Sequence, residues 1–271
     1  VSYIGDNGLA PRLHNPFSIT IKDNYAYVFT EGGLTILDIS NPASPAYVGR
    51  CLIWTLGDGP LSRSVKSGYV SGNYAYIVTD STDPPGRLEI VDISNPAAPD
   101  KRTEIALSTS ACPFYGLSVY VVGNYAYVID YDGNSLEIFN VSDPDNPSSA
   151  GIITNGEGYA KLSGPLGLFV QNNHAYIVGH KYLEVVDVSN PAAPAHKGTV
   201  IRGDGVAKLH EPRKVFVVDD TAYVATNNDA LEIVNISDPS NPIHKSSIVN
   251  GVSGAKLDNP LDVYVSGNYA Y

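Results

Sequence analysis

The chain of 271 residues is 43% hydrophobic and 17% charged, and its formal net charge is −11 at pH 7. Such a composition supports a sizeable core and excludes a disordered chain. The negative charge repels nucleic-acid phosphates and anionic lipid surfaces, so we expect no nucleic-acid partner. No apolar run approaches the roughly 18 to 20 residues needed to cross a bilayer, so we expect no direct membrane insertion.

The first recognisable feature along the chain is Asn-Tyr-Ala-Tyr at 24–27, followed by Leu-Thr-Ile-Leu-Asp at 34–38 and a Ser-Asn-Pro turn. The first motif recurs at intervals of 47 to 51 residues and the second at intervals of 47 to 54 residues. The first motif returns, twice in altered form, at 73–76, 124–127, 173–176, 220–223 and 268–271, and the second at 88–92, 136–140, 183–187 and 231–235. A repeat without a linker predicts one domain spanning 1–271. Because the chain begins at Val1 and contains no methionine, we expect it to be a segment of a longer protein.

Each repeat predicts four short strands. An apolar stretch such as 19–21 or 215–217 precedes a two-residue turn and then Tyr-Ala-Tyr, which is the pattern of a β-hairpin. The alternating Leu-Glu-Ile-Val-Asp stretch predicts a third strand. The Ser-Asn-Pro turn then leads into a less regular fourth strand, for example 197–201.

Four antiparallel strands at this period are typical of a β-propeller blade, because one such sheet buries both faces only when neighbours stack on it. A flat solenoid is the alternative, but neither terminus resembles the end cap that a solenoid needs. Residues 1–5 resemble a fourth strand, while 261–265 and 268–271 resemble the first two. The sequence therefore predicts an all-β propeller with six visible blades, the last one split between the termini and incomplete.

The stretch Leu-Glu-Ile-Val-Asp-Ile-Ser-Asn-Pro at 88–96 resembles the LVIVD repeat family, and similar stretches cover five complete units and half of a sixth. The resemblance implies a propeller of bacterial or archaeal surface-associated proteins, with an extracellular or cell-surface location and a role in protein interaction. It offers no catalytic motif to carry over. We therefore expect no enzymatic activity and no cofactor.

Two units depart from the repeat by placing asparagine where the others have aspartate. Asn140 and Asn235 each begin an Asn-x-Ser sequon. A structural role in the repeated turn is one interpretation, and glycosylation of an exposed loop is the other.

Residues that recur in every unit are expected to be structural, so function is expected where one unit differs. The segments that link one blade to the next carry a basic residue in a repeated position, at Arg12, Lys161, Lys208 and Lys256. These residues could form an anion site on an acidic protein, or they could pair with repeat glutamates such as Glu184 and Glu232.

The exceptions to the repeat concentrate in the second and third units. The linking segments 51–60 and 108–116 and the loops 79–87 and 130–135 are irregular, and we expect them on one sector of the binding face. They carry aromatic residues that would form a platform for a protein or a sugar ring: Trp54, Phe114, Tyr115 and Tyr131. Packing of Trp54 and Phe114 between blades is the alternative.

Further candidates are the two cysteines and the polar residues of the irregular loops. Cys51 and Cys112 lie in successive linking segments, where they could form a disulfide or remain two buried thiols. Asp130, Asp132 and Asn134 weakly resemble a calcium-binding loop, although Asp-Gly is also common in ordinary turns. His180 occupies a loop without an equivalent elsewhere, and Arg213 completes the candidate partner-binding residues together with Asp130 and Asp132.

The prediction that follows is a non-enzymatic extracellular propeller that binds another surface protein or a second copy of itself, with a carbohydrate as a further partner. The alternative is a secreted polysaccharide hydrolase or lyase. Its carboxylates would lie at the channel mouth, for example Glu211 with Asp258 or Asp262.

Overall fold

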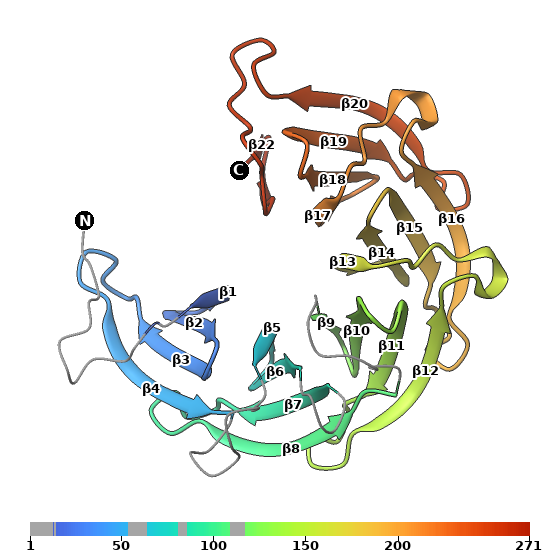
Figure 1. Ribbon diagram of the computed structural model, residues 1–271. Helices are drawn as coiled ribbons and strands as arrows, with labels where there is room; N and C mark the ends of the chain where they lie inside the picture. Colours follow the sequence, from blue (N-terminus) through green and yellow to red (C-terminus); the bar gives the residue numbers. More distant parts are fainter. Residues whose placement is uncertain (1–12, 14, 54–63, 81–85, 109–116) are drawn as a thin grey trace. The chain divides into compact units, whose positions relative to one another are not determined.

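The computed structural model describes residues 13, 15–53, 64–80, 86–108 and 117–271 (Figure 1). These residues form β-strands and two 3-10 helices, η1 (Glu157–Tyr159) and η2 (Asp204–Val206). Among them, five antiparallel sheets have four strands each and a sixth has two. Within the same residues, no helix is long and apolar enough to cross a membrane. The predicted all-β fold is confirmed.

We call the sheets blades one to six in chain order, and in each the strands are neighbours in sequence order. Blade one contains β1 (Pro16–Lys22), β2 (Tyr25–Thr30), β3 (Gly33–Asp38) and β4 (Ala46–Leu52). Blade two contains β5 (Val65–Ser71), β6 (Tyr74–Thr79), β7 (Arg87–Asp92) and β8 (Asp100–Ala106). Blade three contains β9 (Leu117–Val122), β10 (Tyr125–Asp130), β11 (Ser135–Asn140) and β12 (Ser148–Thr154). Blade four contains β13 (Pro165–Gln171), β14 (His174–Gly179), β15 (Tyr182–Asp187) and β16 (Ala195–Ile201). Blade five contains β17 (Pro212–Val218), β18 (Thr221–Thr226), β19 (Ala230–Asn235) and β20 (Ile243–Val249), and blade six contains β21 (Val265–Ser266) and β22 (Tyr269–Ala270).

The first two strands of each blade are joined by the predicted tight turn. Between β13 and β14, Asn172 and Asn173 have φ values of 49° and 61°. A type I′ hairpin turn requires positive φ at both central residues, and asparagine tolerates it better than most residues. The hairpin prediction is confirmed.

The third strand ends in a side-chain-capped turn. The carboxylate of Asp187 accepts a hydrogen bond from the backbone N–H of Ser189 at 2.9 Å. The side-chain oxygens of Asn140 and Asn235 accept the same bond from the backbone N–H two residues later, at 3.0 and 2.9 Å. Asparagine therefore replaces aspartate without loss of the turn, which supports the structural interpretation of this position. Glycosylation of the two sequons stays a prediction.

Contacts divide the chain into two compact units. The first unit comprises Val1–Val128 with Phe139–Ser149, and the second comprises Ile129–Ile138 with Ala150–Tyr271. The boundary passes through blade three, and each unit is described here by itself. The closed ring and the single domain stay predictions, and residues 1–5, expected to belong to the last blade, lie outside the described residues.

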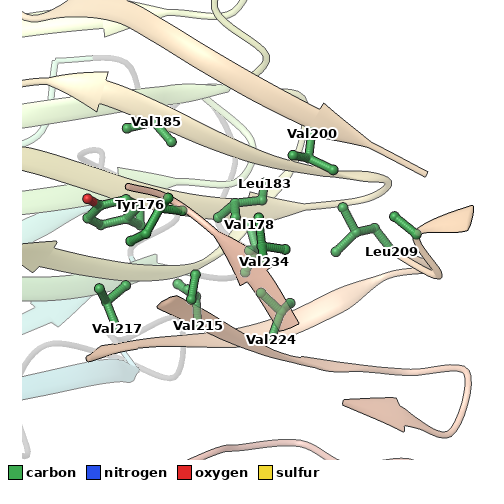
Figure 2. Close-up of a cluster of buried hydrophobic side chains, with 13 residues drawn as sticks. Tyr176, Val178, Leu183, Val185, Val200, Leu209, Val215, Val217, Val224 and Val234 are labelled. Carbon is green, nitrogen blue, oxygen red and sulfur yellow. The ribbon is translucent and has the colours of Figure 1, made fainter. Parts of the chain in front are cut away.

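The core of the second unit lies between blades four and five (Figure 2). Tyr176, Val178 and Leu183 on one blade pack against Val215 and Val217 on the next. Each of these side chains is at least 95% buried. Burying an aliphatic side chain of this size contributes about 1.5–3 kcal/mol, so the stacking of blades supplies much of the stability.

The first unit is packed by the same contacts between blades one and two. Phe29 on β2 is fully buried, and its ring lies against the backbone of Gly68 on β5. A Cβ atom added at Gly68 would lie only 2.1 Å from a ring carbon of Phe29. Glycine at this position therefore creates the space for the aromatic ring.

A glutamate in the middle of the third strand is buried in blades two to five. The residues are Glu89, Glu137, Glu184 and Glu232. Glu184 contacts His196 and Glu232 contacts His244, and each histidine comes from the fourth strand of the same blade. Among the described residues, Glu184 and Glu232 thus pair with histidines rather than with the side chains of the lysines in the linking segments. Burial without a polar partner would be costly for a carboxyl group.

Candidate functional site

The loops at one edge of the second unit are tied together by a repeated hydrogen bond. The linking segment between blades three and four donates from Gly164 N to Asn134 Oδ1 at 2.9 Å. The next linking segment donates from Glu211 N to the carbonyl oxygen of His180, also at 2.9 Å. Each linking segment therefore lies beside the loop between the second and third strands of the blade before it, as the sequence predicted.

Three of the predicted site residues meet in this loop layer. The hydroxyl of Tyr131 lies 3.0 Å from Nε2 of His180, and Arg213 lies 3.5 Å from the carboxylate of Glu211. Glu211 also accepts a hydrogen bond from Asn227 at 2.7 Å. We call these five residues the Tyr131 cluster. Hydrogen bonding by Asn227 lowers the pKa of Glu211, and the nearby positive charge of Arg213 lowers it further.

The predicted calcium loop is held by turn hydrogen bonds. Asp130 Oδ1 accepts from the backbone N–H groups of Asp132 and Gly133, both at 3.0 Å. Burial raises the pKa of Asp130. The amide oxygen of Asn134 already accepts from Gly164. Among the residues that the structure describes, no group of three or more His, Cys, Asp or Glu side chains is placed to hold a metal.

Several predicted residues lie outside the described part of the chain. They are Trp54, Cys112, Phe114 and Tyr115, so the aromatic platform and the disulfide stay predictions. Cys51 is buried on β4, and burial raises the pKa of its thiol form to about 11. A thiol with so high a pKa is a poor nucleophile at neutral pH.

A pocket of about 430 Å³ opens beside the Tyr131 cluster, at the end of β15 and β16. We call it the basic pocket. Its lining residues come from the linking segment after blade three and from blade four: Asn155, Lys161, Ser163, Lys181, Tyr182, Ile201 and Arg202. The pairing of Tyr182 with Ile201 and the hydrogen bond from Arg202 N to Lys181 O at 2.8 Å hold its two sides together.

Three cations line the basic pocket of a protein that is acidic as a whole. In the part of the chain that the structure describes, Lys161, Lys181 and Arg202 form no ion pair with a carboxylate. Acidic side chains lie close by: the carboxyl of Glu184 accepts a hydrogen bond from the backbone N–H of Lys161, Glu157 accepts one from Thr154 N, and Asp204 accepts one from Ile201 N. In the described part of the chain, none of these carboxyl groups forms an ion pair with the side chains of Lys161, Lys181 or Arg202.

Tyr182 also belongs to this lining, with its hydroxyl group buried. Its side chain is 5% exposed, and its hydroxyl has no hydrogen-bond partner among the described residues. Burial raises its pKa, and the charge of Glu184 raises it further. An unpaired buried hydroxyl is costly unless a ligand or water completes it.

The basic pocket adjoins the Tyr131 cluster at Gly164. A Cβ atom added at Gly179 would lie 2.3 Å from the hydroxyl of Tyr182 and 2.6 Å from the carbonyl oxygen of Gly164. A Cβ atom added at Gly164 would in turn lie 2.5 Å from Nε2 of His180. The two groups of polar residues thus share one loop layer.

The pocket was only partly visible in the sequence. One of the two interpretations placed Lys161 in an anion site with Arg12, Lys208 and Lys256. The structure places Lys161 beside Lys181 and Arg202 instead, and Arg12 lies outside the described residues. The signal was nevertheless present, because the cationic pair is peculiar to blade four. The position of Lys181 is occupied in the other blades by Gly32, Gly86, Asn134 and Asp229, and the position of Arg202 by Ile53, Leu107, Asn155 and Asn250.

Solved structures share the fold at low sequence identity. A functionally unknown protein from Desulfotomaculum acetoxidans is 12% identical with a TM-score of 0.68, and the match covers 91% of this chain and 74% of that one. Proteins described as a "putative 6-phosphogluconolactonase" come from Bacteroides fragilis, at 11% identity and TM-score 0.65, and from Bacteroides uniformis, at 12% and 0.69. Both matches cover 91% of this chain and 72% of theirs. Identities this low show the β-propeller fold alone.

The names of the two Bacteroides proteins contradict the expectation that the fold serves no enzymatic role here. That expectation rested on the absence of a familiar catalytic motif, and a fold that hosts many functions gives such an absence little weight. The expectation of no enzymatic activity is therefore overturned, since proteins with this fold carry an enzyme name.

The sequence itself carries the family relationship. No curated protein matches it significantly. The LVIVD repeat pattern, in contrast, matches six times, at 17–53, 62–102, 115–155, 167–201, 212–249 and 260–271. These matches cover most of the chain and coincide with the six blades. The chain belongs to the LVIVD repeat family.

Proposed function

We propose that the protein binds a small metabolite through its phosphate or carboxylate group, which enters the basic pocket of blade four. The observation that carries this proposal is the convergence of Lys161, Lys181 and Arg202 without a described carboxylate partner. Because blades one, two, three and five lack the cationic pair of blade four, the pocket is a departure from the repeat rather than a part of it.

The lining groups suit an oxyanion. The guanidinium of Arg202 presents parallel N–H donors that match a phosphate or carboxylate, while the two lysines supply point charges. Hydrogen bonds to charged groups contribute about 1.5–3 kcal/mol each, so two or three of them support a dissociation constant between about 1 mM and 1 μM.

The size of the pocket favours a metabolite over a bare ion. Its volume of about 430 Å³ lies within the range of about 300–1,000 Å³ that is typical of small-molecule sites. The two Bacteroides proteins carry a name that refers to a phosphorylated sugar-acid lactone. Inorganic phosphate, gluconate and 6-phosphogluconate are therefore the first probes.

Isothermal titration calorimetry at low salt tests the proposal. Lys161→Gln removes one pocket cation, and Lys208→Gln is the matched control because it removes the lysine of the same repeated position outside the pocket. We expect Lys161→Gln to weaken binding about tenfold and Lys208→Gln to change it less than about twofold. Equal effects of the two substitutions, or no binding of any probe by the unaltered protein, would contradict the proposal.

A second candidate function is hydrolysis of an anionic sugar lactone. The observation that favours it is the contact between Tyr131 and His180 next to the pocket. In the tautomer whose Nε2–H donates to the Tyr131 oxygen, Nδ1 is left to accept a proton from an attacking water. Lactone opening in a pH-stat would measure it. We expect His180→Gln to abolish turnover while 6-phosphogluconate still binds, and turnover that survives this substitution would exclude the candidate.

We keep the extracellular location and the surface-protein partner as proposals that rest on the family resemblance. Labelling of intact cells with a membrane-impermeant biotin reagent tests the location. Labelling of the protein on intact cells supports it, and labelling only after lysis contradicts it.

A further inference from the structure

We infer that the natural ligand of the basic pocket is an anionic oligosaccharide, and that Tyr159 at the rim stacks on the sugar ring next to the one whose charge enters the pocket. This inference rests on the proposed anion site and names its ligand class. It begins from a strained and exposed aromatic residue that the fold does not require.

Tyr159 lies at the tip of a tight hairpin with a left-handed backbone. Its φ is 76°, and the hairpin is closed by the hydrogen bond from Gly156 N to Ala160 O at 2.8 Å. The same hairpin returns after blades four and five. The equivalent residues are Val206 with φ 67° and Gly254 with φ 83°.

Gly254, in the third copy of the hairpin, shows which residue suits this backbone conformation best. Glycine adopts this conformation without steric cost, whereas a tyrosine or a valine is strained in it. The side chain of Tyr159 is 83% exposed, so packing offsets little of this strain. Val206 carries the same strain, so strain alone does not distinguish Tyr159; its distinguishing feature is an exposed aromatic side chain within two residues of the pocket residue Lys161.

The position of the hairpin indicates a role for this side chain. Asn155, Lys161 and Ser163 lie on either side of the tip and line the basic pocket, and η1 packs along β16, whose last residue Ile201 lines it too. Tyr159 itself is not part of the lining. A ligand that contacts both the lining of the basic pocket and Tyr159 must therefore extend from the pocket to the hairpin tip.

An aromatic ring beside an anion pocket suits a charged sugar chain. The flat face of a tyrosine packs against the apolar C–H face of a pyranose, while a carboxylate or phosphate on the adjacent sugar pairs with the lysines and Arg202. A free phosphate or a single sugar acid would fill the pocket and leave the tyrosine unused. The arrangement therefore favours at least two linked sugar residues.

The experiment compares trigalacturonate with galacturonate by calorimetry, with cellotriose as the uncharged trimer. We expect the trimer to bind about tenfold more tightly than the monomer, and cellotriose not to bind. Tyr159→Gly should remove this advantage and leave the monomer unchanged, while Tyr159→Phe should retain it. In addition, Tyr159→Gly should raise Tm by about 2 °C, because it relieves the backbone strain.

Val206→Gly is the matched control. Val206 occupies the same strained position and is 76% exposed, but none of the residues of its hairpin from 203 to 209 lines the pocket. Its replacement should raise Tm in the same way and leave the affinity for both ligands unchanged.

The inference is overturned if the trimer binds no more tightly than the monomer, if Tyr159→Gly leaves its advantage intact, or if Tyr159→Gly lowers Tm. The oligosaccharide inference and the anion site give different results when they fail. If galacturonate or phosphate binds and depends on Lys161 while the trimer gains nothing, only the oligosaccharide is excluded. If no anion binds at all, both proposals fall.

Discussion

The hydroxyl of Tyr131 lies 3.0 Å from Nε2 of His180, and the two rings meet edge to face with centroids 5.5 Å apart. The two residues come from equivalent loops of consecutive blades, 49 positions apart in the sequence. This contact joins the irregular loop of blade three to the site on blade four. Gly164, from the linking segment, lies against both rings.

Substitution of Gly164 by alanine should separate this pair. An added Cβ would lie 2.5 Å from Nε2 of His180 and 3.0 Å from Cε2 of Tyr131, on a backbone with φ +59°. We expect the imidazole to move away, because it is the free end of a side chain. NMR spectra of the histidine ring nitrogens would report the loss of the hydrogen bond. Gly158→Ala, at φ +52° with open space around it, carries the same backbone cost, and its spectrum should match that of the unaltered protein.

Substitution of Gly68 by alanine should destabilise the first unit. The new methyl group would overlap the fully buried ring of Phe29, and overpacking of this kind costs about 1–3 kcal/mol. Chemical denaturation measures the loss. The double substitution Gly68→Ala with Phe29→Leu should lose less than the sum of the single changes, because leucine vacates part of the space. Strict additivity would show that the ring is not the obstacle.

The buried carboxyl of Glu184 should make stability depend on pH in an unusual direction. Burial raises its pKa above the ordinary glutamate value of 4.5, against the opposing effects of Thr199 and His196. Above pH 4.5 the folded protein therefore retains a proton that the unfolded chain loses. The contribution of Glu184 is complete below this pH and decreases as the pH rises through the folded pKa.

Denaturation curves of the unaltered protein and of Glu184→Gln, measured between about pH 4 and 8, test this sign. Aspartate and histidine side chains titrate in about this range as well. We expect the difference in the free energy of unfolding to favour the unaltered protein more at the acidic end. A difference that grows toward alkaline pH would mean that His196 holds the carboxylate ionised.

Replacement of Asp187 by asparagine should leave the turn after β15 intact. Asn140 and Asn235 already form the equivalent bond in blades three and five. We expect Asp187→Asn to change Tm at pH 7 by less than about 1 °C and Asp187→Ala to cost about 1 kcal/mol through the lost hydrogen bond. Equal destabilisation by both would show that the charge, rather than the bond, stabilises this turn.

Much of the fold could be predicted because local sequence patterns determine it. The turn at Asn172 and Asn173 and the period of the repeat both act over a few residues, so they define strands and blades without knowledge of the packing. The basic pocket depends instead on strand register. Lys181 and Arg202 lie 21 positions apart and meet only because Tyr182 pairs with Ile201. The pairing of Glu184 with His196 likewise depends on a bulge between Val185 and Val186, which the repeat pattern does not reveal.

The most direct test of the anion site converts blade four into blade five at the two decisive positions. Lys181→Asp with Arg202→Asn installs the residues that stand at Asp229 and Asn250, which the fold already accommodates. Calorimetry with 6-phosphogluconate is the measurement, and circular dichroism checks the fold. We predict that binding weakens by about 100-fold or more while the fold is retained, because two charge-assisted contacts are lost and a repelling carboxylate is gained. Unchanged affinity in a folded variant would contradict the assignment of the basic pocket.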